Sequence, residues 1–233
     1  MNKSPLILAV DTDDLDVAKR WVSTTSEYIG VYKLGLEFFV KFGIPGVQSI
    51  LAETDIDIFL DLKLHDIPNT VAKSAAQLRD INPLFLTVHA SGGREMINAA
   101  SRSLPNSKIT AVTILTSLDS VDLAEIGYLG TSQERAAQMA SFAVSAGAKA
   151  IVCSPQEIAA VRQVVSPDIQ IITPGVRPLS LKVSTIGGDD QKRTMDPKSA
   201  IVAGANYLVI GRPITQAEDM PRAAQEILDE VLN

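Results

Sequence analysis

Short apolar runs alternate with longer amphipathic segments along the whole chain. The apolar runs are rich in β-branched residues and read as buried strands. The predicted strands cover residues 6–12, 31–36, 56–64, 84–90, 109–116, 150–154, 169–176 and 207–211. Helical patterns fill the gaps, most clearly at 132–147, where alanines recur at spacings of three and four. Strands that alternate with helices indicate βαβ units and a parallel sheet.

Two stretches of the chain resemble each other, Ala-Gly-Ala-Lys-Ala-Ile-Val at 146–152 and Ala-Gly-Ala-Asn-Tyr-Leu-Val at 203–209. Both read as a helix end, a glycine cap and a strand. Their separation is close to two eighths of the 233 residues, which suits units six and eight of an eightfold cycle. We therefore predict one α/β domain over residues 1–233, a (β/α)8 TIM barrel with its active site at the carboxyl ends of the strands. A doubly wound open sheet is the alternative.

Charged residues interrupt the third predicted strand. Side chains alternate along a strand, so Asp61 and Lys63 face one side and the leucines between and around them face the other. An unpaired charge inside a barrel would be destabilising by several kcal/mol or more, on the order of a buried ion's desolvation. Asp11 and Lys33 also interrupt apolar runs. Each could be a structural ion-pair partner, but four such charges together favour a functional site.

Glycine followed by arginine ends the last two strands, at Pro174-Gly175-Val176-Arg177 and at Gly211-Arg212. Barrel enzymes often bind phosphate in the loops after strands seven and eight, where backbone N–H groups add to an arginine's grip. These stretches predict a phosphate site, against the alternative of plain glycine turns with exposed arginines. The long polar connection at 178–190 is predicted to be a lid over that site.

Composition and net charge exclude several classes of function. The net charge of -6 and the pI near 5.0 argue against a general nucleic-acid or anionic-membrane binder. No apolar run approaches the length of a membrane span. Cys153 is the single cysteine, so an intrachain disulfide is impossible and the cytoplasm is the expected compartment. We expect Cys153, His65 and His89 to be structural, and no cluster has zinc-ligand spacing.

The ten residues Asp-Leu-Lys-Leu-His-Asp-Ile-Pro-Asn-Thr at 61–70 resemble the signature of the orotidine 5'-phosphate decarboxylase family. The resemblance continues in order over nearly the whole chain. It includes Ala-Val-Asp at 9–11, Lys-Leu-Gly at 33–35, Leu-Thr-Ser at 115–117, Thr-Pro-Gly-Val-Arg at 173–177 and Ile-Gly-Arg-Pro at 210–213. The segment at 178–191 is a few residues longer than the family's usual phosphate loop, which bears on Gln191.

The resemblance implies a role for each matching residue. Lys63 would be the proton donor, Asp61 would lie beside the substrate carboxylate, and Lys33 and Asp66 would complete an alternating array of lysines and aspartates. Asp66 and Thr70 would reach across the interface of a homodimer. The remaining substrate contacts implied are Asp11 to the ribose, Thr116 to the pyrimidine, Arg177, Gln191, Gly211 and Arg212 to the phosphate, and Ile67 and Pro174.

The implied reaction converts orotidine 5'-monophosphate to uridine 5'-monophosphate and carbon dioxide in pyrimidine biosynthesis, with no cofactor and no metal. A fixed ammonium at Lys63 could stabilise the carbanion and protonate it. One alternative is a magnesium-dependent sugar-phosphate decarboxylase or synthase of the same barrel group. Another is a non-catalytic barrel that binds a nucleotide or phosphate. Lys33 and the Ile-Pro-Asn-Thr stretch at 67–70 favour the pyrimidine enzyme.

Overall fold

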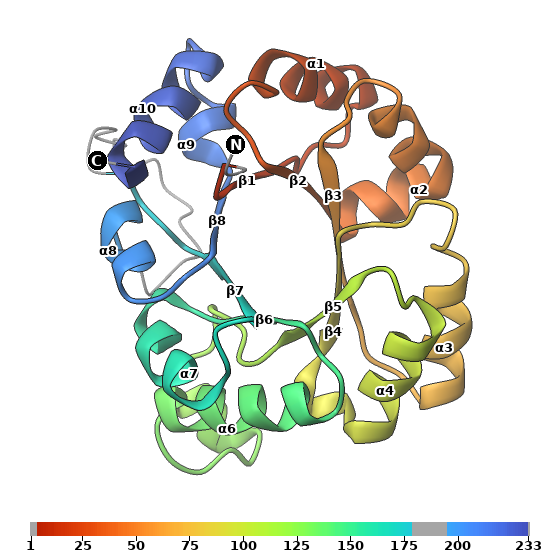
Figure 1. The fold of residues 1–233 in the computed structure, drawn as a ribbon, viewed down its shortest axis with the longest axis vertical. Coiled ribbons are helices and arrows are strands. Elements are labelled where there is room, and N and C mark those ends of the chain that lie inside the picture. The colour runs from red at the N-terminus through yellow and green to blue at the C-terminus, as the bar shows by residue number, and fades with distance from the viewer. Residues whose placement is uncertain (1–3, 179–194, 233) are drawn as a thin grey trace.

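The computed structural model describes residues 4–178 and 195–232, which form a closed barrel of eight parallel strands (Figure 1). The strands pair in chain order, and the last closes on the first, with Leu6 opposite Leu208. The strands are β1 Leu6–Ala9, β2 Val31–Gly35, β3 Asp57–Leu64, β4 Phe85–His89, β5 Lys108–Val112, β6 Ala150–Val152, β7 Gln170–Pro174 and β8 Tyr207–Ile210. The predicted barrel is confirmed. The open sheet is wrong, because the barrel has no free edge.

Helices surround the barrel as an outer ring (Figure 1). They are α1 Leu15–Thr25, α2 Leu36–Leu51, α3 Pro68–Ala76, α4 Arg94–Ser103, α5 Ser120–Glu125, α6 Ser132–Ser145, α7 Ile158–Val164, α8 Pro197–Val202, α9 Arg212–Thr215 and α10 Met220–Leu232, with 3₁₀ helices η1 Ala90–Gly92 and η2 Pro155–Glu157. Because all the strands are parallel, their carboxyl ends meet at one mouth.

All eight predicted strands are present, but four of them end two or more residues earlier than predicted. β1 stops at Ala9, β5 at Val112, β6 at Val152 and β7 at Pro174. Past β5, the backbone N–H and the hydroxyl of Thr113 both donate to the carbonyl of Val152. The apolar run therefore continues after regular pairing has ended. Hydrophobicity does not mark the end of a strand here, because the mouth of the barrel is also lined by apolar side chains.

The repeated Ala-Gly-Ala stretches have the same local structure. Gly147 and Gly204 both have positive φ, 106° and 114°, a conformation that favours glycine. In each stretch the residue after the glycine donates its N–H to a carbonyl five residues earlier, at 3.0 Å. This is a Schellman-type helix end. The predicted helix at 132–147 therefore ends at Ser145, and Gly147 turns the chain into β6.

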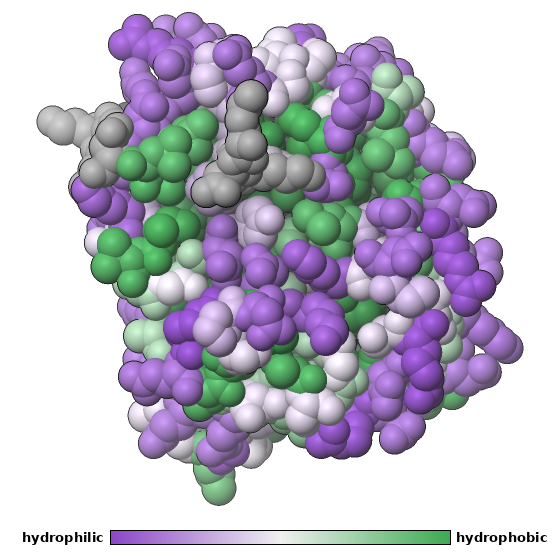
Figure 2. Space-filling model, in the orientation of Figure 1, coloured by the Kyte–Doolittle hydropathy of each residue, from purple (hydrophilic) through white to green (hydrophobic). Residues whose placement is uncertain are grey.

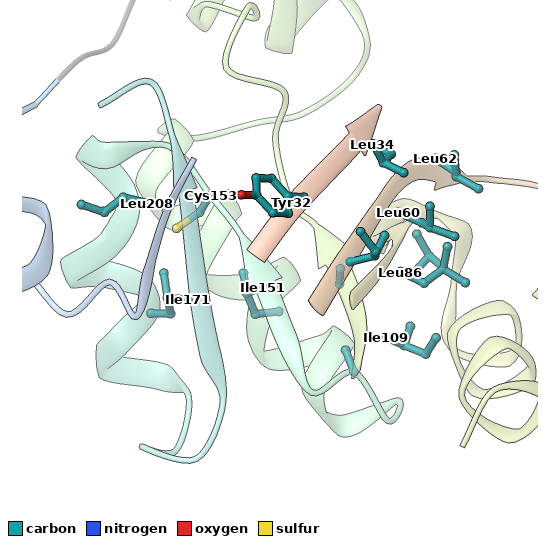
Figure 3. Close-up of a cluster of buried hydrophobic side chains, with 14 of the residues drawn as sticks. Tyr32, Leu34, Leu60, Leu62, Leu86, Ile109, Ile151, Cys153, Ile171 and Leu208 are labelled. Carbon is teal, nitrogen blue, oxygen red and sulfur yellow. The ribbon is translucent and has the colours of Figure 1, made fainter. Parts of the chain in front are cut away.

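Alternation along the strands divides the apolar side chains into two clusters. The smaller cluster fills the barrel and contains Ile7, Val31, Phe59, Phe85, Ala150 and Ile172. The larger lies between the barrel and the helices, and Figure 3 shows part of it, including Leu60 and Leu62 of β3. The alternate positions on β3, Asp61 and Lys63, face inward. The leucine side of this strand is thus buried against the helices, as the sequence predicted.

The pairing of β3 with β4 is interrupted near the mouth. Leu60 is opposite Leu86, and pairing resumes with Leu64 opposite Val88, so β3 carries two additional residues. Lys63 lies in this bulge with φ of 49°, in the left-handed region. A non-glycine residue held there costs about 1–3 kcal/mol, and such residues are enriched at functional sites. Bulges of this kind commonly redirect a side chain beside an active site.

The surface of the barrel is mixed in character. In the face shown in Figure 2, hydrophilic residues form most of the outline and hydrophobic residues are exposed in separate patches. Leu36, Val40 and Ile67 are among the exposed large apolar residues, at 57%, 77% and 65% of their surface. Within residues 4–178 and 195–232, no helix has the length and apolar character needed to cross a membrane.

Candidate active site

Three charged side chains meet inside the mouth at β2 and β3. The ammonium nitrogen of Lys63 lies 2.9 Å from each carboxylate oxygen of Asp61. The ammonium of Lys33 approaches the same carboxylate at 3.7 Å. The side chains of Lys33 and Asp61 are only 10% and 15% exposed, whereas that of Lys63 is 37% exposed. Asp61 therefore holds two ammonium groups together, and Lys63 has the more open position of the two.

A second carboxylate extends this array towards β1. Lys33 donates to Asp11 at 3.0 Å, and the Asp11 side chain is 54% exposed at the cavity edge. Gly35, at the end of β2, makes room for this pair. A Cβ at position 35 would lie 2.9 Å from the Asp11 carboxylate and 3.2 Å from the Lys33 ammonium. Any side chain there would have to displace the ion pair.

Thr87 of β4 is a member of the site that the sequence reasoning missed. Its hydroxyl donates to Asp61 at 3.1 Å and accepts the backbone N–H of Lys63 at 2.8 Å. Thr87 is completely buried. Threonine is common in strands, so the residue type alone did not indicate a functional role. Its inward position on β4, between Phe85 and His89, was the available clue.

The environment keeps Asp61 ionised. Burial raises the pKa of its carboxyl, but the ammonium groups of Lys33 and Lys63 and the hydrogen bonds from Lys63 and Thr87 outweigh that effect. The pKa of Asp61 therefore lies below its ordinary value. At neutral pH the site presents a fixed carboxylate between two ammonium groups.

The array lines one side of a cavity of about 680 Å³ at the mouth of the barrel. Such a volume is typical of small-molecule sites.

Nine of the predicted residues line this cavity: Asp11, Lys33, Asp61, Lys63, Thr116, Pro174, Arg177, Gly211 and Arg212. The floor is apolar, formed by Phe59, Val112, Val152 and Val209. Trp21, Thr215 and Gln216 also line the cavity and were not predicted, because an amphipathic helix does not reveal which of its residues reach a neighbouring mouth.

The glycine-arginine stretches lie at the side of the cavity formed by β7 and β8. Gly175 has φ of 79° and allows the chain to turn directly after β7. The backbone N–H of Arg177 donates to the carbonyl of Met195 at 2.9 Å, so the chain that follows β7 pairs with the chain that leads into α8. Arg212 is exposed at the first turn of α9. Two guanidinium groups and a helix start thus line one side of the cavity, in an arrangement suited to an anion.

Three predicted residues lie outside this cavity, and one lies outside the described residues. Asp66 is exposed, and its carboxylate accepts the N–H of Ile67 at 2.6 Å. Ile67 and Thr70 are also exposed, at the N-cap and in the first turn of α3. They follow β3 at the barrel mouth, so they border the site without lining it. Gln191 and the predicted lid beyond Pro178 fall in the segment that is not described.

Two histidines pack beside the array. The rings of His65 and His89 have centroids 5.3 Å apart. Burial lowers the pKa of His89, and His65 and Lys63 lower it further. Both rings lie next to the bulge in β3 and outside the cavity lining. Within the described part of the chain, no group of three or more His, Cys, Asp or Glu residues has a geometry that could hold a metal ion.

Comparison with known proteins supports one family. A model of the orotidine 5'-phosphate decarboxylase / HUMPS family matches residues 4–227. Orotidine 5'-phosphate decarboxylase of Thermobifida fusca (strain YX) is 43% identical over 228 residues, covering 98% of this chain and 96% of that protein. The protein of the same name from Sphingopyxis alaskensis is 45% identical over 225 residues, covering 96% and 97%.

A solved structure of a protein with the same name is similar to this chain over its full length. The crystal structure of orotidine 5'-phosphate decarboxylase from Lactobacillus acidophilus superimposes with a TM-score of 0.84 at 32% identity, covering 99% of this chain and all of that one. The similarity thus extends over the whole barrel and includes every strand that contributes to the cavity. The chain belongs to the orotidine 5'-phosphate decarboxylase / HUMPS family.

Proposed function

We propose that this protein decarboxylates orotidine 5'-monophosphate to uridine 5'-monophosphate and carbon dioxide, a step of pyrimidine biosynthesis. The observation that carries the proposal is the ion-paired array of Lys33, Asp61 and Lys63 at the cavity wall. It is supported by two relatives named orotidine 5'-phosphate decarboxylase, which match nearly the full chain. The cytoplasm, where small-molecule biosynthesis takes place, is the proposed location.

The nucleotide would lie across the mouth of the barrel. Its phosphate would contact Arg177, Gly211 and Arg212, on the side of the cavity where positive charge and a helix start are found. Gln191, Pro174 and Ile67 are proposed as further contacts. The ribose hydroxyls would meet the exposed edge of Asp11, and the pyrimidine would lie near Thr116. The reacting carbon would then be next to Lys63.

The chemistry needs one carbon–carbon bond to break. When that bond to the carboxylate carbon breaks, carbon dioxide leaves and the electron pair remains on C6 of the ring. The Lys63 ammonium stabilises this developing charge and then transfers a proton to C6. The resulting neutral amine regains a proton from water. Overall, the carboxylate is replaced by a proton, so the reaction needs neither an oxidant nor a cofactor.

Asp61 and Lys33 prepare Lys63 for this step. The two hydrogen bonds to Asp61 hold the ammonium of Lys63 in one place. Lys33 fixes the carboxylate from the other side. A preorganised charge of this kind does not have to be reoriented during the reaction, which is the main source of electrostatic catalysis. Asp61 would also lie beside the carboxylate that leaves.

The exposed turn after β3 suggests that the site is completed by a second copy of the chain. Asp66, Ile67 and Thr70 are exposed here, and Leu36, another exposed apolar residue, follows the carboxyl end of β2, the strand that pairs with β3. We propose a homodimer in which Asp66 and Thr70 enter the partner's site. Burying these apolar residues would stabilise the dimer.

Mixing two inactive variants tests the shared site. Lys63→Ala disables the site of its own subunit, and Asp66→Asn would disable the site of its partner. A mixed dimer would then contain one intact site, and an equal mixture should regain about a quarter of the wild-type activity. A mixture that stays inactive although mixed dimers form would contradict the sharing.

The reaction itself is tested with purified protein in excess EDTA. Orotidine 5'-monophosphate is added, and the ultraviolet absorbance of the pyrimidine is followed. We expect turnover that EDTA does not reduce. If this substrate stays unchanged while a β-keto acid sugar phosphate is decarboxylated in the presence of Mg²⁺, the sugar-phosphate alternative is correct.

A further inference from the structure

The hydroxyl of Thr87 lies at the junction between the two functional residues of β3. Thr87 is on β4 and is completely buried. Its oxygen lies 2.8 Å from the backbone nitrogen of Lys63 and 3.1 Å from a carboxylate oxygen of Asp61. It is outside the cavity lining, so it cannot act on the substrate directly. Any effect it has on the reaction must pass through Asp61 and Lys63.

The direction of both hydrogen bonds is determined by their partners. A backbone N–H can only donate, so the Thr87 oxygen accepts from Lys63. An ionised carboxylate can only accept, so the Thr87 hydroxyl donates its proton to Asp61. The single hydroxyl is therefore used in both directions, which fixes its rotation. Serine could replace it in this role, but valine, which has the same shape, could not.

The bulge in β3 explains why such a contact is needed. Between Leu60 and Leu64 the regular pairing with β4 is interrupted, and Lys63 has a left-handed backbone. The Lys63 N–H would otherwise lack its ladder partner, and a buried unpaired N–H is strongly destabilising. Thr87 supplies the acceptor from the neighbouring strand. It therefore supports a conformation that a lysine rarely adopts.

We propose that Thr87 is a positioning residue for the decarboxylation: its hydroxyl holds the bulged backbone at Lys63 and the carboxylate of Asp61 in a single arrangement. In that arrangement the Lys63 ammonium lies 2.9 Å from both oxygens of Asp61. Without the hydroxyl, the backbone of Lys63 and the Asp61 side chain gain alternative conformations, and the ammonium is less often at the reacting carbon. The catalytic part of this inference rests on the proposed function, whereas the hold on Lys63 does not.

Thr110 provides a matched control from the same barrel. It lies on β5 directly opposite Thr87 in register, and it is also completely buried. Its hydroxyl donates to the backbone carbonyl of Lys108 at 2.9 Å. Thr110→Val thus removes a buried hydroxyl of the same kind without touching the array, and it reports the general effect of such a change on stability.

The experiment measures kinetics and amide exchange in wild type, Thr87→Val, Thr87→Ser and Thr110→Val. We expect Thr87→Val to lower kcat by about 10- to 100-fold, with KM and uridine 5'-monophosphate affinity within about threefold. Thr87→Ser should recover kcat to within about threefold of wild type, and Thr110→Val should leave it within about twofold. Exchange of the Lys63 amide should be at least about tenfold faster in Thr87→Val alone.

Three results would overturn the proposal. The first is a kcat in Thr87→Val within threefold of wild type, and the second is an equal loss in Thr110→Val. The third is an unchanged exchange rate at the Lys63 amide. If Thr87→Val fails to fold, the same comparison is made between Thr87→Ser and Thr87→Ala. If the wild type does not decarboxylate the nucleotide, the proposed function fails, and the amide exchange still decides whether Thr87 holds Lys63.

Discussion

Replacing Asp61 with asparagine should destabilise the folded protein, because one carboxylate is shared by two lysines. Both of its oxygens lie 2.9 Å from the Lys63 ammonium, and one of them lies 3.7 Å from that of Lys33. Removing one partner of a fully buried ion pair costs about 3–5 kcal/mol. Here Lys33 keeps Asp11 at 3.0 Å, and the Lys63 side chain is 37% exposed to water. We therefore expect a loss of about 2 kcal/mol in the free energy of unfolding.

Urea unfolding followed by circular dichroism measures this loss, with Asp13→Asn as the control. Asp13 also pairs with a lysine, Lys41 at 3.1 Å, but their side chains are 70% and 49% exposed. The control should change stability by less than about 0.5 kcal/mol. For a chain of this length, the loss in Asp61→Asn corresponds to a fall in Tm of about 4–8 °C.

The dependence on pH gives a second check on Asp61. Its pKa is lowered in the folded state, so its stabilising effect is present above the ordinary value near 3.8 and is lost as the pH falls through the folded-state pKa. The stability difference between wild type and Asp61→Asn should therefore shrink on acidification. Equal stability of the two proteins at pH 7, or an equal loss in Asp13→Asn, would refute the reasoning.

Three other predictions concern separate parts of the molecule. Burial raises the pKa of Tyr32 to about 12, so its stabilising effect is complete below pH 10 and is lost as the pH rises through 12. In urea titrations, the stability advantage of wild type over Tyr32→Phe should fall by about 2 kcal/mol between pH 9 and 12, and a constant difference would contradict this. Arg212→Ala should weaken uridine 5'-monophosphate binding by about 10- to 100-fold in calorimetry while changing kcat much less, and an equal effect on both would refute a binding role. Cys153 is completely buried, so a thiol reagent should label it only after unfolding, and rapid labelling of the native protein would contradict the packing.

The sequence was sufficient to predict the barrel and most of the site, because these follow from local patterns. Alternation on β3 placed Asp61 and Lys63 inward and Leu62 outward, which the structure confirms. The glycine-arginine stretches were likewise recognisable from a few adjacent residues. A parallel barrel brings the carboxyl ends of all strands together, so residues far apart in the chain could be assigned to one mouth.

The features that were missed depend on contacts between strands. The left-handed conformation of Lys63 results from the shifted register between β3 and β4, which no local pattern reveals. Thr87 matters because of where that register places it, and its residue type is ordinary for a strand. The need for glycine at position 35 follows from the Asp11–Lys33 ion pair that lies next to it. Such close approaches between neighbouring strands can be seen only in three dimensions.

The central claim is that the Lys63 ammonium stabilises and protonates the carbanion. It is tested most directly by comparing wild type with Lys63→Ala in EDTA, with kcat measured on orotidine 5'-monophosphate and binding measured with uridine 5'-monophosphate. We predict that kcat falls by at least about 10⁴-fold while the product's Kd stays within about tenfold, because the ammonium acts on charge that develops during the reaction. A Lys63→Ala protein that keeps its kcat within tenfold of wild type would contradict the claim.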